Sequence, residues 1–404
     1  MDWQTSEDTV PSAFITEANS RAIVGKPPAT GAWRVGDPPG DRRFVSIGAL
    51  DLETGGHLPV VRIAYETHGT LNADGSNAIL ILHALTGDSH VAGLPGPGHT
   101  TAGWWNTLVK PGGAIDTDKW FVVAPNMLGG CQGSTGPASH APDGVEWGAR
   151  FPYLTIRDQV SAQVAFSDAI GVDRWAAVIG GSMGGMQALE WAVGHPDRLD
   201  RVAILAAPDL SNADQIALNS VQVEAIRMDP AFAEGEYYDA ADGEGPYRGL
   251  ALARRMALLS YRSPTELNDR FERSWQSGVT PLGGEGRFAV ESYLDFHGNK
   301  FTRRFDANSY ITLVEAMSSH DVGRGRGGVP AALARVTART LVVGIDSDRL
   351  FPIEQQRRIA AHLPATIDGG EISVLTSPFG HDGFLIEDEI VGENIRRLLE
   401  NRQA

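Results

Sequence analysis

The sequence predicts an α/β fold, with a mostly parallel central sheet, helices on both faces of that sheet, and an inserted helical cap. Three observations support this prediction. Strand-like apolar runs alternate with helical patterns, the alternation stops between residues 209 and 335, and a glycine-rich turn directly follows one buried run. Together they indicate a doubly covered sheet with one helical insertion.

The strand-like runs are rich in Val, Ile and Leu, and the later ones are almost continuously apolar. Buried parallel strands have this composition because both of their faces are covered. Helical patterns at 156–171 and 186–199 lie between such runs, as crossover helices do. The expected strands are 59–69, 77–85, 120–128, 174–181, 200–208, 339–346 and 371–377.

The order of these patterns divides the chain into four parts. Residues 1–42 are polar and rich in Pro and Gly, so we expect an extended, poorly ordered leader. Residues 43–208 and 336–404 are expected to form the two parts of the α/β core. Residues 209–335 are helical in pattern and interrupt the sheet, which predicts a cap over the carboxyl ends of the strands.

Composition excludes several classes of protein. The 404 residues carry 50 acidic and 34 basic side chains, a formal net charge of −16, which argues against nucleic acid as a partner. Cys131 is the single cysteine, so neither an intramolecular disulfide nor a cysteine zinc site can form, and we expect a cytoplasmic protein. The N-terminus lacks a secretory pattern and no apolar run reaches membrane-spanning length.

The glycine-rich turn, "GGSMG" at 180–184, fits the pattern G-x-S-x-G between a predicted strand and a predicted helix. In that setting small neighbours let the backbone turn sharply and expose the hydroxyl of Ser182. The helix N-terminus then favours negative charge that develops beside the serine. A turn that merely contains a serine is the alternative, and the flanking strand and helix favour a nucleophile.

A serine nucleophile of this kind requires an acid and a histidine later in the chain, in the order found in α/β-hydrolase folds. Asp346 and Asp348 follow the strand at 339–346, and sequence position does not choose between them. His381 follows the last predicted strand, and a surface-loop histidine is the alternative for it. The backbone amides of Met183 and Leu85 are the expected oxyanion donors.

Two histidines flank the predicted oxyanion loop. His83 and His90 begin and end the stretch "HALTGDSH". We expect them to hold this loop by hydrogen bonds rather than to take part in chemistry. Cys131 is expected to be buried packing, because no histidine follows it in triad order.

Several separated stretches, taken in order, resemble homoserine O-acetyltransferases of the α/β-hydrolase type, which act in methionine synthesis. The resemblance covers residues from about 45 to 400 and leaves out the leader. It rests on "HALTGDSH", "NMLGGCQGSTGPAS", "GGSMGGMQALEW", "LARRMALLSYRS", "SHDVGRGRGG", "DSDRLFP" and "GHDGFL".

The resemblance implies a role for individual residues. It places the nucleophile on Ser182, the acid on Asp348 rather than Asp346, and the base on His381. It also implies that Arg254 and Asp382 hold homoserine. A guanidinium can bind the α-carboxylate through two hydrogen bonds, and a carboxylate can accept from the α-ammonium.

The implied reaction is transfer of the acetyl group of acetyl-CoA to the hydroxyl of L-homoserine through an acyl-serine. CoA enters as a substrate, so no bound cofactor and no metal are implied. The resemblance also implies a homodimer that pairs through the cap helices. Arg324 and Arg326, in "GRGRGG", are equally consistent with CoA binding and with salt bridges within the cap. Arg255, next to Arg254, leaves the helical register open.

Other functions share most of these features. A succinyl donor, or L-serine as acceptor, is not excluded, because one methylene in a pocket cannot be predicted from sequence. A serine carboxylesterase has the same triad, although Arg254 and Asp382 suit an amino acid and have no role for a lipid. Binding modules with this fold typically lose a triad residue, whereas all three positions are filled here.

Overall fold

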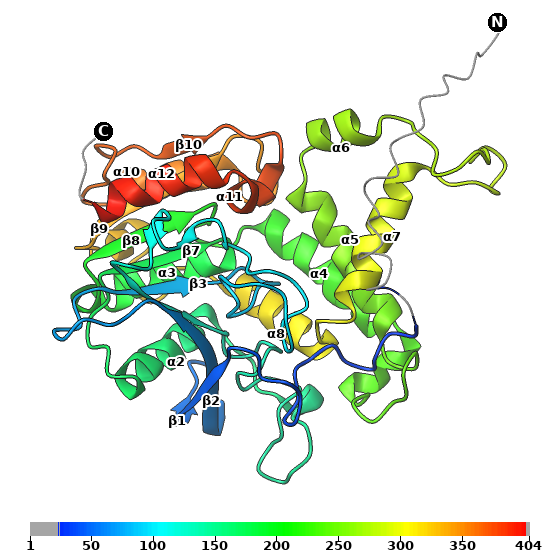
Figure 1. The fold of residues 1–404 in the computed structure, drawn as a ribbon, viewed down its shortest axis with the longest axis horizontal. Coiled ribbons are helices and arrows are strands. Elements are labelled where there is room, and N and C mark those ends of the chain that lie inside the picture. The colour runs from blue at the N-terminus through cyan, green and yellow to red at the C-terminus, as the bar shows by residue number, and fades with distance from the viewer. Residues whose placement is uncertain (1–22, 24, 401–404) are drawn as a thin grey trace, which may run out of the picture.

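The computed structural model describes residue 23 and residues 25–400 (Figure 1). At its centre is an eight-stranded sheet in the order β1-β2-β6-β3-β7-β8-β9-β10. The first two pairings are antiparallel and all the others are parallel, which confirms the predicted α/β class. The strands are β1 (Arg43–Asp51), β2 (His57–His68), β3 (Ala78–Leu82), β6 (Phe121–Pro125), β7 (Ala177–Gly181), β8 (Arg201–Leu205), β9 (Arg339–Ile345) and β10 (Ser373–Leu375).

Helices cover both faces of this sheet because successive side chains of each strand point to opposite sides. Leu80 and Leu82 of β3 belong to one apolar core, shared with α2, α3 and α10. Ile79 and Ile81 belong to the other, shared with α12 and with a short ladder of β4 and β5. The elements are α2 (Ile156–Ala169), α3 (Met183–Gly194), α10 (Ile353–His362), α12 (Asp388–Leu399), β4 (Val109–Lys110) and β5 (Ile115–Asp116).

Between β8 and β9 the chain is helical, and the helices labelled α4 to α7 lie to the right of the sheet in Figure 1. They are α4 (Ala213–Arg227), α5 (Tyr247–Tyr261), α6 (Pro264–Phe271), α7 (Ala289–Phe301), α8 (Ala307–Ser318) and α9 (Val329–Leu333). Two short helices after β10 complete the fold, η5 (Gly380–Asp382) and α11 (Gly383–Ile386). Strand β1 and helix α7 are not among the expected elements. The cap limits at residues 209 and 335 stay a prediction.

Residues 25–42, the described end of the predicted leader, contact both the α/β core and the inserted helices. The amide of Trp33 donates to the carbonyl of Cys131 at 2.9 Å, and that of Gly31 donates to Phe305 at 3.1 Å. The Thr30 hydroxyl donates to Asp306 at the start of α8. This segment therefore joins the core to the inserted helices. The leader prediction otherwise concerns residues outside the described part of the chain.

Among the described residues, no helix combines the length and apolar character needed to cross a membrane.

The turn between β7 and α3 is built by glycines that make room for neighbouring backbone. A Cβ at Gly184 would lie 2.1 Å from the carbonyl oxygen of Leu82, and one at Gly180 would lie 2.1 Å from that of Gly184. A Cβ at Gly181 would meet the Phe384 ring at 2.4 Å. Real side chains never approach so closely, so strand and helix can meet only if these positions lack side chains.

We predict that Gly184→Ala destabilises the protein by about 1–3 kcal/mol, because the added methyl forces β3 and α3 apart. The measurement is the free energy of unfolding from urea titration. The matched control is Gly194→Ala at the other end of α3, where the nearest atom to an added Cβ is an Arg326 nitrogen at 3.6 Å. Equal stability losses in the two variants would contradict this account of the turn.

Candidate active site

Ser182 lies at the apex of the β7–α3 turn in a strained backbone conformation. Its φ is 58° and its ψ is −125°, values that a residue with a side chain rarely adopts. Its amide donates to the Leu205 carbonyl at 2.9 Å, and its carbonyl accepts from Gly185 and Met186. These bonds hold the serine in the strained conformation and present its hydroxyl beyond the carboxyl ends of the strands.

The structure brings Ser182, His381 and Asp348 together, as expected. Nε2 of His381 accepts from the Ser182 hydroxyl at 2.8 Å, and Nδ1 donates to Asp348 Oδ2 at 2.7 Å. The three residues are buried, and the other carboxylate oxygen of Asp348 accepts the amides of Leu350 and Phe351. Such a chain fixes the tautomer of the imidazole and its orientation toward the hydroxyl.

Asp346, the other acidic candidate, has a different place. Its carboxylate accepts the Ser377 amide at 3.2 Å and so ties β9 to the segment after β10. Nδ1 of His381 donates to Asp348 and not to Asp346. The geometry therefore assigns the acid position to Asp348.

Two opposing effects act on the pKa of His381. Burial disfavours the charged imidazolium, but the negative charge of Asp348 and its hydrogen bond favour it, and the pKa is raised above its ordinary value. Rings of Tyr261, Phe351 and Phe384 surround the imidazole, with centroids 5.2–5.7 Å away. The site thus stabilises the protonated histidine that forms when serine loses its proton.

A cavity of about 250 Å³ opens in front of Ser182. Leu85 lies in its wall beside Ala84 and Thr86, and Met183 is the first residue of α3. Among the described residues, neither the Leu85 amide nor the Met183 amide donates to a backbone carbonyl outside regular helices and strands. Both amides are therefore available to an oxyanion formed at the serine.

Arg254 and Asp382 line this same cavity. Arg254 comes from α5, and its guanidinium lies over the rings of Tyr261 and Phe301, 5.4 and 5.1 Å from their centroids. Its Nη1 lies 3.4 Å from the Thr86 hydroxyl. A guanidinium supported by ring faces and a weak hydroxyl contact keeps its strong donor capacity for an incoming carboxylate.

Arg255 points elsewhere, which resolves the register of α5. Its Nη1 pairs with Asp295 of α7 at 2.9 Å, and it does not line the cavity. Arg254 and Arg255 point in different directions because neighbouring residues on a helix do not share a face.

The sequence analysis did not assign a role to Arg262, although it lies in the quoted stretch "LARRMALLSYRS". Arg262 lines the cavity, and its Nε is 3.3 Å from Asp382 Oδ2. Burial raises the pKa of Asp382, while Arg262, His381 and Arg254 act in the opposite direction. The only signal for Arg262 was its position eight residues after Arg254, just over two helical turns.

Arg324 and Arg326 do not line the cavity in front of Ser182. Arg324 pairs with Glu53 at 2.7 Å, and Arg326 pairs with Glu190 of α3 at 2.6 Å. The structure supports salt bridges for "GRGRGG", but their partners Glu53 and Glu190 lie in the core, whereas bridges within the cap were expected. These bridges tie the loop to the core rather than leaving its charges for a phosphate.

The histidines of the oxyanion loop hold that loop, as expected. His83 Nδ1 donates to the Ala84 carbonyl at 2.8 Å, and its Nε2 accepts the Met127 amide. Burial lowers the pKa of His83 to about 4, so this ring is neutral. His90 Nδ1 lies 2.9 Å from Glu66. Cys131 is buried too, and burial raises the pKa of its thiol to about 12.

In the described part of the chain, one cluster combines three residues of types that bind metals: Glu66, His90 and His99. The two imidazole rings are stacked with centroids 3.9 Å apart and planes 10° apart. A metal must lie close to the plane of each imidazole that binds it, which two stacked rings cannot both satisfy. This cluster does not fit a metal ion.

Comparison with known proteins bears on the whole chain. An α/β hydrolase fold family model matches residues 77–388. A protein of Clavibacter michiganensis subsp. michiganensis called homoserine O-acetyltransferase is 70% identical over 386 residues, covering 96% of this chain and 99% of that protein. The chain belongs to the homoserine O-acetyltransferase family. A homoserine O-acetyltransferase of Thermobifida fusca is 58% identical, covering 92% of this chain and 97% of that protein.

Solved structures similar to this family member include both transferases and hydrolases. A homoserine O-acetyltransferase from Bacillus anthracis has a TM-score of 0.82 and 27% identity, covering 90% of this chain and 98% of that one. The structure of esterase E22 has a TM-score of 0.78 and 26% identity, covering 89% and 99%. The backbone therefore serves both reaction types, and side chains must distinguish them.

We predict that a fluorophosphonate, a reagent directed at activated serines, labels Ser182, with a rate that rises with pH through a midpoint above 6.5. The neutral imidazole is the form that accepts the serine proton, and the pKa of His381 is raised, so the rate is lost as pH falls through that value. Asp348→Asn should slow labelling by about 10⁴-fold. The measurement is labelling followed by intact mass, with Ser182→Ala as control.

A labelling rate that does not depend on pH between 5 and 9 would contradict this assignment of the base.

Proposed function

We propose that the protein is a homoserine O-acetyltransferase that transfers the acetyl group of acetyl-CoA to the hydroxyl of L-homoserine, in methionine biosynthesis. The observation that carries this proposal is the presence of Arg254 and Asp382 in one cavity with Ser182 and His381. A cation and a carboxylate beside the nucleophile match the two charges of an amino acid. The identity to relatives named for this activity supports the same conclusion.

The first half of the reaction makes an acyl-enzyme. His381 takes the proton of the Ser182 hydroxyl, whose oxygen attacks the thioester carbonyl of acetyl-CoA. The Leu85 and Met183 amides donate to the oxyanion of the tetrahedral intermediate, each worth about 3–4 kcal/mol in comparable sites. The carbon–sulfur bond then breaks, and CoA leaves as a thiol with the proton that His381 held.

The second half uses the same groups with homoserine as the nucleophile. Arg254 binds the α-carboxylate and Asp382 accepts from the α-ammonium, so that the side-chain hydroxyl points toward the acyl carbon. His381 removes the proton of that hydroxyl while its oxygen attacks the acetyl carbon. The bond from that carbon to Ser182 Oγ then breaks, His381 returns the proton to Oγ, and O-acetylhomoserine leaves. An ammonium beside Asp382 would favour its ionised form, offsetting the burial that raises its pKa.

Water must be kept from the acyl-serine for transfer to compete with hydrolysis. Ser182 and His381 are 4% and 3% exposed, and the cavity wall on one side comes from α5. Arg254 and Tyr261 of that helix face Ser182 across the cavity. The bound amino acid therefore displaces water at the position from which attack occurs.

Hydrolysis is the second candidate function, because an esterase has nearly the same backbone. An esterase would turn over acetyl-CoA or simple acetyl esters equally well with and without homoserine. A succinyl donor and a serine acceptor remain alternatives within the transferases. Steady-state rates with acetyl-CoA and succinyl-CoA, each with homoserine and with serine, separate these possibilities.

A homodimer is part of this proposal, as the resemblance implies. Four apolar side chains on two inserted helices are between 41% and 50% exposed: Ile216, Val221, Leu252 and Leu259. Ile216 and Val221 are on α4, and Leu252 and Leu259 are on α5. The two helices pack against each other, so their exposed faces supply apolar surface for a second copy.

We predict that Arg254→Gln raises the KM for homoserine by about 10- to 100-fold, because it removes a charge-assisted contact to the α-carboxylate. The KM for acetyl-CoA should change little. The matched control is Arg255→Gln, which removes the same charge from the adjacent residue that pairs with Asp295. If both variants raise the KM for homoserine equally, Arg254 does not bind the acceptor.

We also predict that acetyl-CoA without homoserine leaves one acetyl group on Ser182, which intact mass and peptide mapping detect. Adding homoserine should remove this group within one turnover, because the acceptor hydroxyl attacks the acyl-serine. Ser182→Ala should carry no acetyl group and should have no transfer activity. Appreciable transfer by Ser182→Ala would rule out the covalent route.

A further inference from the structure

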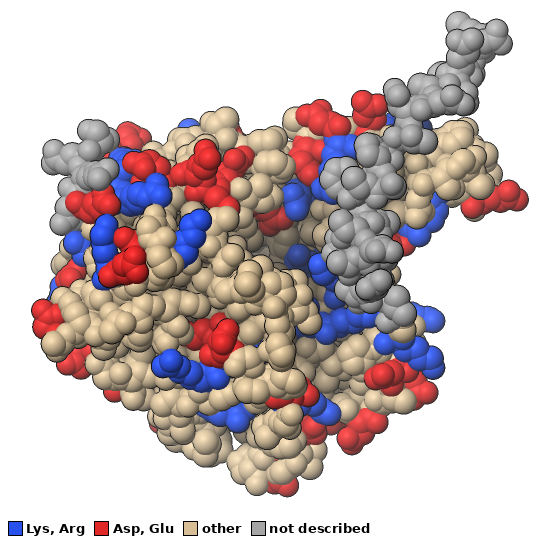
Figure 2. Space-filling model, in the orientation of Figure 1, with Lys and Arg blue, Asp and Glu red and all other residues tan. Residues whose placement is uncertain are grey.

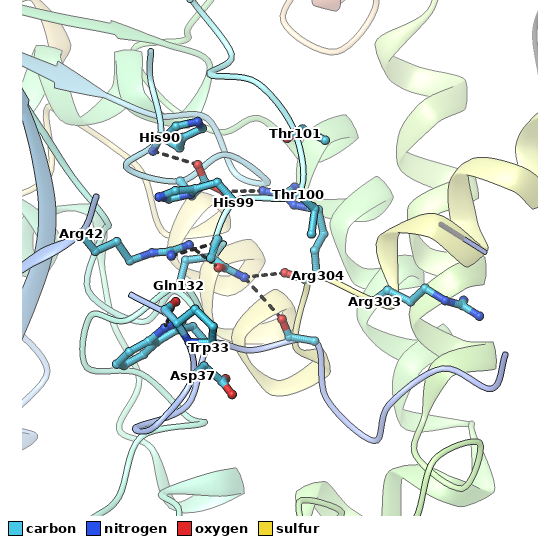
Figure 3. Close-up of a pocket in the computed structure, with 14 residues that line it drawn as sticks. Trp33, Asp37, Arg42, His90, His99, Thr100, Thr101, Gln132, Arg303 and Arg304 are labelled. Atoms are coloured by element: carbon cyan, nitrogen blue, oxygen red, sulfur yellow. Dashed lines mark hydrogen bonds and ion pairs between the residues drawn. The ribbon is translucent and has the colours of Figure 1, made fainter. Parts of the chain in front are cut away.

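Figure 3 shows a second cavity, of about 190 Å³. The two cavities share one loop: Leu85 and Thr86 line the first, whereas Asp88 and His90 line the second. Arg304 bridges them, since its Nη1 donates to the Thr86 carbonyl and its Nη2 to Asp88, both at 2.8 Å. A ligand that occupies both cavities would therefore run along this loop.

Arg42 is a buried cation in the wall of this cavity. It is 6% exposed, and its guanidinium donates to the carbonyls of Pro39 and Gly98 and to the Gln132 side chain. Within the described residues, Arg42 has no carboxylate at ion-pair distance, and its Nε has no hydrogen-bond acceptor. Burial lowers the pKa of Arg42, and Asp88 and Glu66 oppose this only from beyond ion-pair distance, which favours an anion next to the guanidinium.

Two further buried nitrogens in the same wall lack acceptors. Nε2 of His90 and Nε2 of His99 have no hydrogen-bond partner among the described residues. His99 Nε2 is 3.3 Å from a Glu66 oxygen but without hydrogen-bond geometry. His99 can present an N–H at Nε2 as a neutral ring, whereas His90, whose Nδ1 donates to Glu66, does so only as the imidazolium.

The carboxylates around this cavity are already engaged. Asp88 accepts from Arg304 and from the His90 amide, and Asp37 accepts from the Arg34 amide at 2.7 Å. Figure 2 shows Lys and Arg side chains along the boundary between the core and the inserted helices, on a protein of net charge −16. The cavity is thus a local site for an anion on an otherwise acidic molecule.

We propose that this second cavity binds the phosphate-bearing nucleotide end of acyl-CoA. The inference rests on the proposed acyl transfer, because the thioester must be at Ser182 while the rest of the donor extends away. Asp88 is three residues after Leu85, so their Cα atoms are at most about 11 Å apart. The pantetheine arm of CoA can span that separation, and its phosphates then meet Arg42 and Arg304. Homoserine is too short to need a second cavity.

Thr100 offers a test that leaves the buried residues intact. Its side chain lines the cavity close to that of Arg304 and is exposed (Figure 3). Thr100→Glu places a negative charge where phosphate would bind, and Thr100→Gln is the matched neutral control. Neither substitution touches the acyl-enzyme machinery.

We expect Thr100→Glu to raise the KM for acetyl-CoA at least about tenfold, as the loss of a charge-assisted contact does. Thr100→Gln should stay within about twofold of the wild type, a margin smaller than one hydrogen bond to a charged group. The KM for homoserine and the rate with S-acetylpantetheine, a donor without phosphates, should not change in either variant. Acetyl-3′-dephospho-CoA tells which phosphate binds: an unchanged effect of Thr100→Glu points to the diphosphate, and a lost effect to the ribose 3′-phosphate.

The proposal is wrong if Thr100→Glu leaves the KM for acetyl-CoA unchanged, or if it impairs S-acetylpantetheine as strongly as acetyl-CoA. Calorimetric binding of CoA itself gives a readout that does not need turnover. If the wild type binds CoA more tightly than Thr100→Glu but does not acetylate homoserine, the phosphate site holds and the proposed function is wrong. If the wild type transfers acetyl to homoserine but binds CoA no more tightly than Thr100→Glu, the proposed function holds and the phosphate site is wrong.

Discussion

The active site depends on one close backbone contact, between the Leu82 carbonyl at the end of β3 and the backbone of Gly184 at the start of α3. A side chain at position 184 would lie 2.1 Å from that oxygen. Because strand and helix meet so closely, the residue between them must take the strained turn, and Ser182 has a φ of 58°. The same contact sets the Met183 amide beside the serine hydroxyl, next to the loop that carries Leu85.

Charge placement then determines what the activated serine can acylate. The negative charge of Asp348 raises the pKa of His381 although the ring is buried. Arg254 rests on ring faces and lacks a carboxylate partner in the described part of the chain, so an acceptor with its own carboxylate can complete it. Arg42, in the second cavity, also lacks a carboxylate at ion-pair distance among the described residues. Two arginines without a carboxylate partner thus match the carboxylate of the proposed acceptor and the phosphates of the proposed donor.

Most of the fold and the reacting groups were predictable from sequence, because both depend on local patterns. Apolar runs mark buried strands, and the order of serine, acid and histidine follows from the topology. The role of the glycines was predicted too: they make space for the turn, and the residue with the strained φ is Ser182 itself. Pairing between distant side chains had no sequence signal. Arg324 and Arg326 bind Glu53 and Glu190, and the second cavity is assembled from segments far apart in the chain.

Hydrolases and transferases share this backbone, so the decisive property is the fate of the acetyl group. The most direct measurement is the partition of radiolabelled acetyl from acetyl-CoA between acetate and O-acetylhomoserine at saturating homoserine. The account predicts that nearly all the label enters O-acetylhomoserine in the wild type, and that Arg254→Gln shifts label to acetate. A wild-type enzyme that releases mainly acetate under these conditions would contradict it.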